Sequence, residues 1–251
     1  GPLNHGRGCV KGMSIIEQMY HPQRLLYPQK RIGPRGSGQW QRISWDEAYA
    51  TIAARMNELI QKYGPECISA LTGTGRHHLP YFFRMGNAIG TPNFSSAGGL
   101  ICLGPRRTGA VMTGGLFAGV DYFGKVRPGG ILVRGANPAV SGEDGELQRF
   151  IKDAAREGIP MVVVDPKPNE LTRQAKYWLR IRPGTDGALA LGILNLLIQE
   201  DLYDHDFVEH YTYGFDALKE RCKEYDLERV AKITDIPAAD ILAAARWIGT
   251  T

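Results

Sequence analysis

The sequence predicts an α/β fold built from βαβ units, with mostly parallel sheets and flanking helices. Two short apolar runs, residues 131–133 (ILV) and 161–164 (MVVV), are separated by one helix-length amphipathic segment. They lie about 30 residues apart, which is the spacing of a βαβ unit. A second strand–loop–helix pattern spans residues 68–89. Strands that alternate with helical segments in this way favour parallel sheets covered by helices.

Composition and charge are those of an ordinary water-soluble globular protein. The chain has 251 residues, of which 43% are hydrophobic and 22% charged, and its formal net charge is +4. This length suits one large domain or two. The mild, dispersed positive charge gives no argument for a nucleic-acid partner. No apolar run reaches the ~18 residues of a membrane span, so we expect no direct membrane insertion.

The two ends of the sequence suggest a piece of a larger protein. The chain has no initiator Met, shows no signal peptide, and stops at residues 249–251 without a terminating element. The sequence therefore leaves open whether the protein is cytoplasmic or periplasmic. Cys67 and Cys222 are widely separated and are interpreted as reduced thiols.

The N-terminal segment places a single cysteine in a glycine-rich loop. Cys9 lies within residues 4–12 (NHGRGCVKG), and such a loop suits a thiolate presented to a metal cluster. One cysteine supplies one ligand of four, and the sequence contains no Cys-x-x-Cys pair. The proline-punctuated residues 21–31 and the glycine-rich residues 33–38 predict irregular structure.

A capping box opens the first long helix. Residues 44–47 (SWDE) place a serine hydroxyl and a glutamate carboxylate three residues apart, so each can satisfy an amide of the other. The predicted helix ends near residues 63–65, where Gly and Pro stop it. After the strand at residues 68–71, a loop carries His77 and His78, which are interpreted either as polar groups of a pocket or as a partly exposed pair.

Cys102 follows a run of small residues and precedes Arg106 and Arg107. Two neighbouring arginines would favour the thiolate of Cys102. A buried structural thiol beside surface arginines is the equally weighted alternative.

A nucleotide crevice is predicted at the carboxyl ends of the strands. Gly135, Asn137 and Asp165 directly follow two strands, and residues 183–186 (PGTD) follow a third at 178–181. Ligands of open α/β sheets bind at this edge. Asp186 can cap the helix at 187–200, or it can accept hydrogen bonds from the N1–H and N2–H groups of guanine. The loop at 135–138 (GANP) lacks G-x-G-x-x-G, which disfavours an NAD-dependent dehydrogenase.

Six motifs together resemble those of the molybdopterin-bis(guanine dinucleotide) oxidoreductases, the dimethyl sulfoxide reductase family. The resemblance covers nearly the whole chain. The motifs are residues 4–12, 22–25 (PQRL), 43–48 (ISWDEA), 135–138, 164–166 (VDP) and 181–186 (IRPGTD).

The resemblance implies roles for individual residues near the metal. Cys9 resembles the last of four cysteine ligands of a 4Fe–4S cluster, and Lys11 resembles the lysine between that cluster and the pterin. Cys102 falls where the family places its protein ligand to molybdenum or tungsten, and a thiolate suits a soft metal centre. The other three cluster cysteines and the domain that closes over the pterins are not in this chain.

The resemblance also implies a site for the guanine dinucleotide ends of the bis-molybdopterin guanine dinucleotide cofactor. Asn137, Asp165 and Asp186 match positions that hold these ends, with Asp186 as the expected guanine reader. The expected cofactor-binding residues are Gly135, Asn137, Asp165, Pro166, Gly184, Thr185 and Asp186.

Three segments are expected on this basis. Residues 1–42 would be the remnant of an iron–sulfur domain with its connecting segment. Residues 43–126 would form a first α/β lobe that carries Cys102. Residues 127–251 would form a Rossmann-like domain that binds the guanine dinucleotide.

The implied function is that of a fragment of a molybdenum- or tungsten-dependent oxidoreductase catalytic subunit. It would act on a small-molecule substrate and pass electrons through the cluster, where an iron–sulfur electron-transfer subunit could receive them. We expect the fragment alone to be inactive. The alternatives are a non-redox hydratase or hydroxyl transferase of the same family, and a pterin-free structural or electron-relay subunit.

Overall fold

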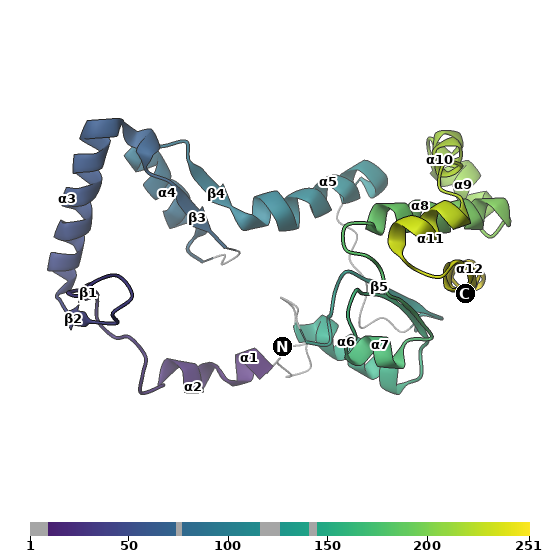
Figure 1. Ribbon diagram of the computed structural model, residues 1–251, viewed down its shortest axis with the longest axis horizontal. Coiled ribbons are helices and arrows are strands. Elements are labelled where there is room, and N and C mark those ends of the chain that lie inside the picture. The colour runs from purple at the N-terminus through teal and green to yellow at the C-terminus, as the bar shows by residue number, and fades with distance from the viewer. Residues whose placement is uncertain (1–9, 74–76, 116–125, 141–144) are drawn as a thin grey trace. The chain divides into compact units, whose positions relative to one another are not determined.

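The computed structural model describes residues 10–73, 77–115, 126–140 and 145–251, and the predicted α/β class is confirmed. The strands form one antiparallel pair, β1–β2, and two parallel sheets, β3–β4 and β5–β6–β7. By their internal contacts, the residues divide into two units, residues 16–120 and residues 1–15 with 121–251. Figure 1 labels the helices and strands of both units. Among the described residues, no helix combines the length and apolarity needed to cross a membrane.

The first unit begins with helix α2 (Ile15–Met19) and a small hairpin. Strands β1 (Gln29–Arg31) and β2 (Trp40–Arg42) pair antiparallel, with Lys30 opposite Gln41. The expectation of irregular structure was therefore wrong for residues 29–31, whereas residues 33–38 contain neither helix nor strand, as expected. Both strands are exposed on both faces, so they have no apolar alternation to reveal them. The backbone ladder and contacts of Arg31 with Trp40 and of Arg42 with Tyr27 stabilise the hairpin.

Helix α3 (Trp45–Tyr63) begins as predicted, but only half of the expected capping box forms. The hydroxyl of Ser44 accepts a hydrogen bond from the amide of Glu47 at 3.1 Å. The Glu47 carboxylate lies 3.6 Å from Nζ of Lys30 on β1, so it pairs with the hairpin. Gly64 ends the helix with φ +83° and donates its amide to the carbonyl of Ile60.

The rest of this unit is a short parallel pair with helices. A 3₁₀ turn (Pro65–Cys67) precedes β3 (Ala70–Thr72), and α4 (Leu79–Ile89) connects β3 to its parallel neighbour β4 (Phe94–Ser96). A π-helical segment (Gly98–Cys102) then runs into α5 (Leu103–Gly114). An ideal Cβ at Gly86 of α4 would lie 2.9 Å from the Phe94 ring, so this glycine allows α4 to pack closely on β4.

The second unit is built on a three-stranded parallel sheet, β5 (Ile131–Arg134), β6 (Met161–Val164) and β7 (Tyr177–Leu179), in that spatial order. Val133 is opposite Val163, and Val163 is opposite Trp178. The helices are α1 (Val10–Met13), α6 (Gly145–Arg156), α7 (Glu170–Gln174), α8 (Asp186–Gln199), α9 (His205–Tyr211), α10 (Phe215–Cys222), α11 (Leu227–Thr234) and α12 (Ala238–Thr250).

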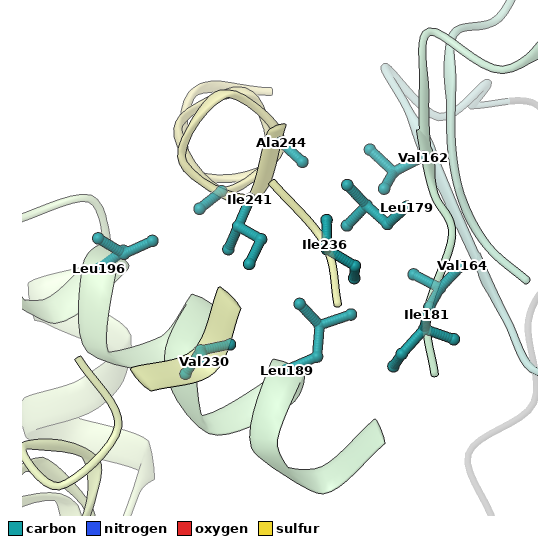
Figure 2. Packing of buried hydrophobic residues seen from close by; sticks show 11 residues of the cluster. Val162, Val164, Leu179, Ile181, Leu189, Leu196, Val230, Ile236, Ile241 and Ala244 are labelled. Carbon is teal, nitrogen blue, oxygen red and sulfur yellow. The ribbon is translucent and has the colours of Figure 1, made fainter. Parts of the chain in front are cut away.

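Strand β6 is enclosed on both faces, which explains its uninterrupted apolar sequence. Met161 and Val163 belong to a buried cluster with residues of α6 and α7. Val162 and Val164 face the opposite cluster, which includes Leu189 of α8 and Ile241 of α12 (Figure 2). Each of the four β6 residues is at most 1% exposed. A strand buried on both faces is the expected centre of a parallel sheet between two helix layers.

Candidate functional site

A pocket of about 350 Å³ lies at the carboxyl ends of the parallel strands in the second unit. Three loops form it, one after each of β5, β6 and β7. Its lining residues are Gly135, Ala136, Asn137, Val164, Asp165, Pro166, Ile181, Pro183, Gly184 and Asp186. Six of the seven expected cofactor-binding residues are in this lining, and Thr185 is not. The crevice expected from the strand order is thus present as a geometric feature.

Two glycines shape the pocket through their backbone. Gly135 has φ +60° and donates its amide to the carbonyl of Val164 at 3.1 Å, which joins the first loop to the end of β6. Gly184 has φ +84° in the turn before α8. Both conformations are strained for a residue with a Cβ. At each glycine the space that a Cβ would enter is open to at least 4 Å, so the backbone there is accessible to a ligand.

Asp165 is a polar residue of the pocket wall that is held by several hydrogen bonds. It is buried, and its backbone is fixed by two contacts with β7: its amide donates to the carbonyl of Leu179, and its carbonyl accepts from the indole of Trp178. Its carboxylate accepts one hydrogen bond at each oxygen. Oδ1 accepts from the amide of Lys167 at 2.9 Å, and Oδ2 accepts from Nδ2 of Asn169 at 2.9 Å.

Asn169 was missed by the sequence reasoning. It caps α7, where its Oδ1 accepts from the amides of Leu171 and Thr172, and Thr172 completes a reciprocal capping box. The signal was present in the sequence as Asn169-x-x-Thr172, a cap pattern of the S/T/D/N type. Helix α7 has only five residues, so no apolar periodicity marked it.

The start of α8 forms the third wall. Asp186 is the first helical residue, half-buried, and lines the pocket. Thr185 occupies the N-cap position, but its hydroxyl donates to the carbonyl of Arg182 at 2.6 Å and caps no helix amide. Thr185 therefore stabilises the turn that carries Gly184. A carboxylate at the first turn of a helix is also favoured by the helix dipole.

The residues expected near the metal belong to other parts of the chain. Cys9 lies outside the described residues. Lys11 is exposed in the short helix α1. For Cys102 the structure describes the backbone, which ends the π-helical segment Gly98–Cys102. π-Helical turns occur frequently at functional sites.

The histidine pair of the first unit is exposed. The imidazole Nε2 of His78 lies 2.7 Å from the hydroxyl of buried Thr72 at the end of β3. His78 is thus fixed against the strand end, and His77 lies on the surface before α4.

Comparison with known proteins gives one consistent family. The model of the molybdopterin oxidoreductase family matches residues 24–238. The acetylene hydratase of Syntrophotalea acetylenica is 35% identical over 246 residues, which cover 96% of this chain and 33% of that protein. The molybdopterin-containing thiosulfate reductase subunit of Salmonella typhimurium is 35% identical, with 98% of this chain and 32% of the relative covered.

Two further relatives support the same grouping. A dimethyl sulfoxide reductase of Escherichia coli is 31% identical over 99% of this chain and 34% of its own length. The solved structure of acetylene hydratase from Pelobacter acetylenicus matches with a TM-score of 0.71 and 35% identity, over 95% of this chain and 32% of that one. The chain spans about one third of the length of these relatives. It belongs to the molybdopterin oxidoreductase family, which includes the dimethyl sulfoxide reductases.

Proposed function

We propose that this chain is the part of a molybdenum- or tungsten-dependent oxidoreductase catalytic subunit that holds a guanine dinucleotide end of the molybdopterin cofactor. The observation that carries the proposal is the pocket beyond β5, β6 and β7. It presents two carboxylates, Asp165 and Asp186, and two glycines with positive φ in a chain of this family.

The pocket fits the chemistry of a nucleoside. Its volume of about 350 Å³ lies within the roughly 300–1,000 Å³ of small-molecule sites. Carboxylates accept hydrogen bonds only, and guanine and ribose present N–H and O–H donors. We assign Asp186 to the N1–H and N2–H groups of guanine and Asp165 to other donors of the nucleotide. Gly135 and Gly184 leave room for the ligand beside the backbone, and Asn137 and Pro166 complete the wall.

The remaining assignments concern the reactive end of the cofactor. When bound, the pterin-held metal would supply two-electron chemistry on a small-molecule substrate. We assign Cys102 as the protein thiolate that binds the metal, Cys9 as a ligand of a 4Fe–4S cluster, and Lys11 as the cation beside the electron path. The π-helical backbone at Cys102 supports the first assignment.

We also propose the three-part division at residues 1–42, 43–126 and 127–251. The third segment contains the whole described pocket. An iron–sulfur electron-transfer subunit is the partner that this arrangement suits.

Water addition without net redox change is a second candidate function. It is favoured by one observation: a solved structure that matches this chain with a TM-score of 0.71 is that of a protein named acetylene hydratase. The pocket for the guanine end would serve either reaction, because that end lies outside the chemistry.

The test is the content and turnover of the full-length protein that contains this chain. We expect about one molybdenum or tungsten and about four irons per chain, with guanine nucleotide released on hydrolysis. A redox-dye assay with small oxo-acceptors, run beside an assay for hydration of an unsaturated substrate, separates the two reactions. Protein from cells grown without molybdate and tungstate is the control. A protein with neither metal and no guanine would overturn the proposal.

A further inference from the structure

We propose that Asn169 is a positioning residue of the pocket, which fixes the Asp165 carboxylate and joins it to the start of helix α7. The proposal deepens the proposed function, because it concerns the same nucleotide site. Asn169 does not line the pocket, and its influence on a ligand would pass through Asp165.

The two ends of the Asn169 amide have different partners, and these partners fix its orientation. Oδ1 lies 2.8 Å from the amide nitrogen of Leu171 and 3.0 Å from that of Thr172. Both partners are donors, so the atom facing them must be the oxygen. The NH₂ group then faces Oδ2 of Asp165 at 2.9 Å. A donor meets an acceptor at every contact.

The Asn169 side chain is also held in place by its surroundings. The Thr172 hydroxyl bonds with the Asn169 backbone, since it accepts from the amide at 2.8 Å and donates to the carbonyl at 3.0 Å; the bonds of the side-chain amide do not involve that hydroxyl. Leu171, two residues after Asn169, is 1% exposed and packs in the buried cluster with Val163. Asn169 and Thr172 are themselves buried. The amide therefore offers Asp165 a donor whose position hardly varies.

This fixed donor determines which acceptor sites of Asp165 remain for a ligand. A carboxylate has about four lone-pair sites. Asn169 and the amide of Lys167 take one at each oxygen, which leaves one site on each oxygen. Because both occupied sites are fixed, the two remaining sites are fixed as well. The carboxylate then needs no reordering when a nucleotide binds, which favours affinity.

The choice of asparagine as the cap is explained by this second role. Serine and aspartate cap helices about as well as asparagine does. Aspartate would place a second carboxylate against Asp165, and serine is too short to cap the helix and reach Oδ2 at once. Asparagine combines the two acceptor bonds to α7 with the donor bond to the pocket.

The experiment uses the full-length protein prepared without its cofactor and titrated with GDP by calorimetry. Asn169→Ser keeps a capping oxygen and removes the amide donor, and Asn169→Asp keeps the cap and adds like-charge repulsion. Thr172→Val is the matched control, because it breaks the capping box and leaves the Asn169–Asp165 bond. We expect Asn169→Ser to raise the Kd for GDP roughly tenfold and Asn169→Asp to raise it further. Thr172→Val should change the Kd for GDP by no more than about twofold, although this variant also lowers the melting temperature.

A second measurement reports on Asp165 without any ligand. The Lys167 amide donates to Oδ1 of Asp165, so its hydrogen exchange reports whether the carboxylate stays in place. We expect this exchange to accelerate in both Asn169 variants and to match wild type in Thr172→Val.

The outcomes separate the two proposals. If the Asn169 variants keep wild-type Lys167 exchange, or if all three variants weaken GDP binding by one factor, Asn169 is a helix cap only and the inference is overturned. If the wild-type protein fails to bind GDP, the proposed nucleotide site is contradicted, and the positioning role then stands or falls on the Lys167 exchange.

Discussion

Arg246 of α12 forms a bidentate ion pair with the carboxylate of Glu200, the residue that follows α8. Its Nε lies 2.8 Å from Oε2, and its Nη2 lies 2.8 Å from Oε1. The hydrogen bonds from Arg246, together with its charge, lower the pKa of Glu200 in spite of the opposing effect of burial. The pair joins two helices of the same buried cluster.

Acid should weaken this link. Because folding lowers the pKa of Glu200, its contribution is complete above the ordinary glutamate pKa of about 4.3 and is lost as the pH falls through the lower folded value. We expect Glu200→Gln to lower the melting temperature at neutral pH and to flatten its decline in acid. Calorimetry across this range checks the slope. Glu209→Gln on α9 is the control, since it removes a carboxylate that is exposed. Identical curves for wild type and Glu200→Gln would contradict the expectation.

Helices α8 and α11 meet at Gly192 and Val230, where no side chain can be added. A Cβ on Gly192 would lie 2.6 Å from Cγ2 of Val230, which is fully buried. Gly192→Ala should therefore destabilise the protein by about 1–3 kcal/mol, although alanine favours helix formation. Chemical denaturation measures the change. Gly187→Ala, in the same helix with open space around it, should be neutral or stabilising. The double variant Gly192→Ala/Val230→Ala should lose less than the two single losses added; strict additivity would count against the contact.

Asp186 should select guanine. Asn in its place presents a donor toward the N1–H and N2–H groups, so Asp186→Asn should weaken GDP binding to the cofactor-free, full-length protein roughly 10- to 100-fold. It should also abolish the preference for GDP over inosine diphosphate, which lacks the N2 amino group. Asp204→Asn makes the same substitution at the N-cap of α9 and should leave GDP binding unchanged. Unaltered nucleotide preference in Asp186→Asn would restrict Asp186 to its interaction with the dipole of α8.

Cys102 should matter for turnover and not for retention of the nucleotide. If its thiolate binds the metal, Cys102→Ala in the full-length enzyme should lower turnover roughly 100-fold or more. Guanine nucleotide per chain, measured after hydrolysis, should remain, because the pocket lies at other residues. The exposed thiol of Cys67 provides the matched control, and Cys67→Ala should retain activity. Full turnover in Cys102→Ala would rule out its assignment as metal ligand.

Elements with strong apolar patterns were predicted well. Strand β6 was expected at residues 161–164 and forms there, and the helix expected at 187–200 forms at Asp186–Gln199. Burial on both faces of β6 and on one face of α8 imposes these patterns. The third strand shows a limit of predictions made from apolar patterns. Ile181 was included in it, and it is buried, but β7 ends at Leu179. Apolar residues mark burial, and the ladder can end before burial does.

Short elements without an apolar stripe were not predicted. The β1–β2 hairpin depends on its backbone ladder and exposed side chains, and α7 depends on the cap at Asn169 and the burial of Leu171. The residues of the pocket likewise include some that could be predicted and some that could not. Gly135, Asp165 and Asp186 could be placed together because the carboxyl ends of parallel strands meet at one edge. Asn169 could not be placed beside them from the sequence, since its contact with Asp165 depends on how a five-residue helix packs.

The enclosure of β6 has a consequence for how this protein can diverge. Every side chain of the strand is packed between two helix layers, so a larger or polar replacement there would disrupt folding before it altered a ligand. The loops at the strand ends are held by hydrogen bonds of Asp165 and Asn169 and by two glycines with positive φ, and not by apolar packing between two layers. Relatives that change their nucleotide chemistry should therefore vary at residues 136–137 and 165–169, while 161–164 stays uniformly apolar and medium-sized. Substitution patterns within the family would then distinguish the residues that stabilise the sheet from the residues that determine ligand specificity.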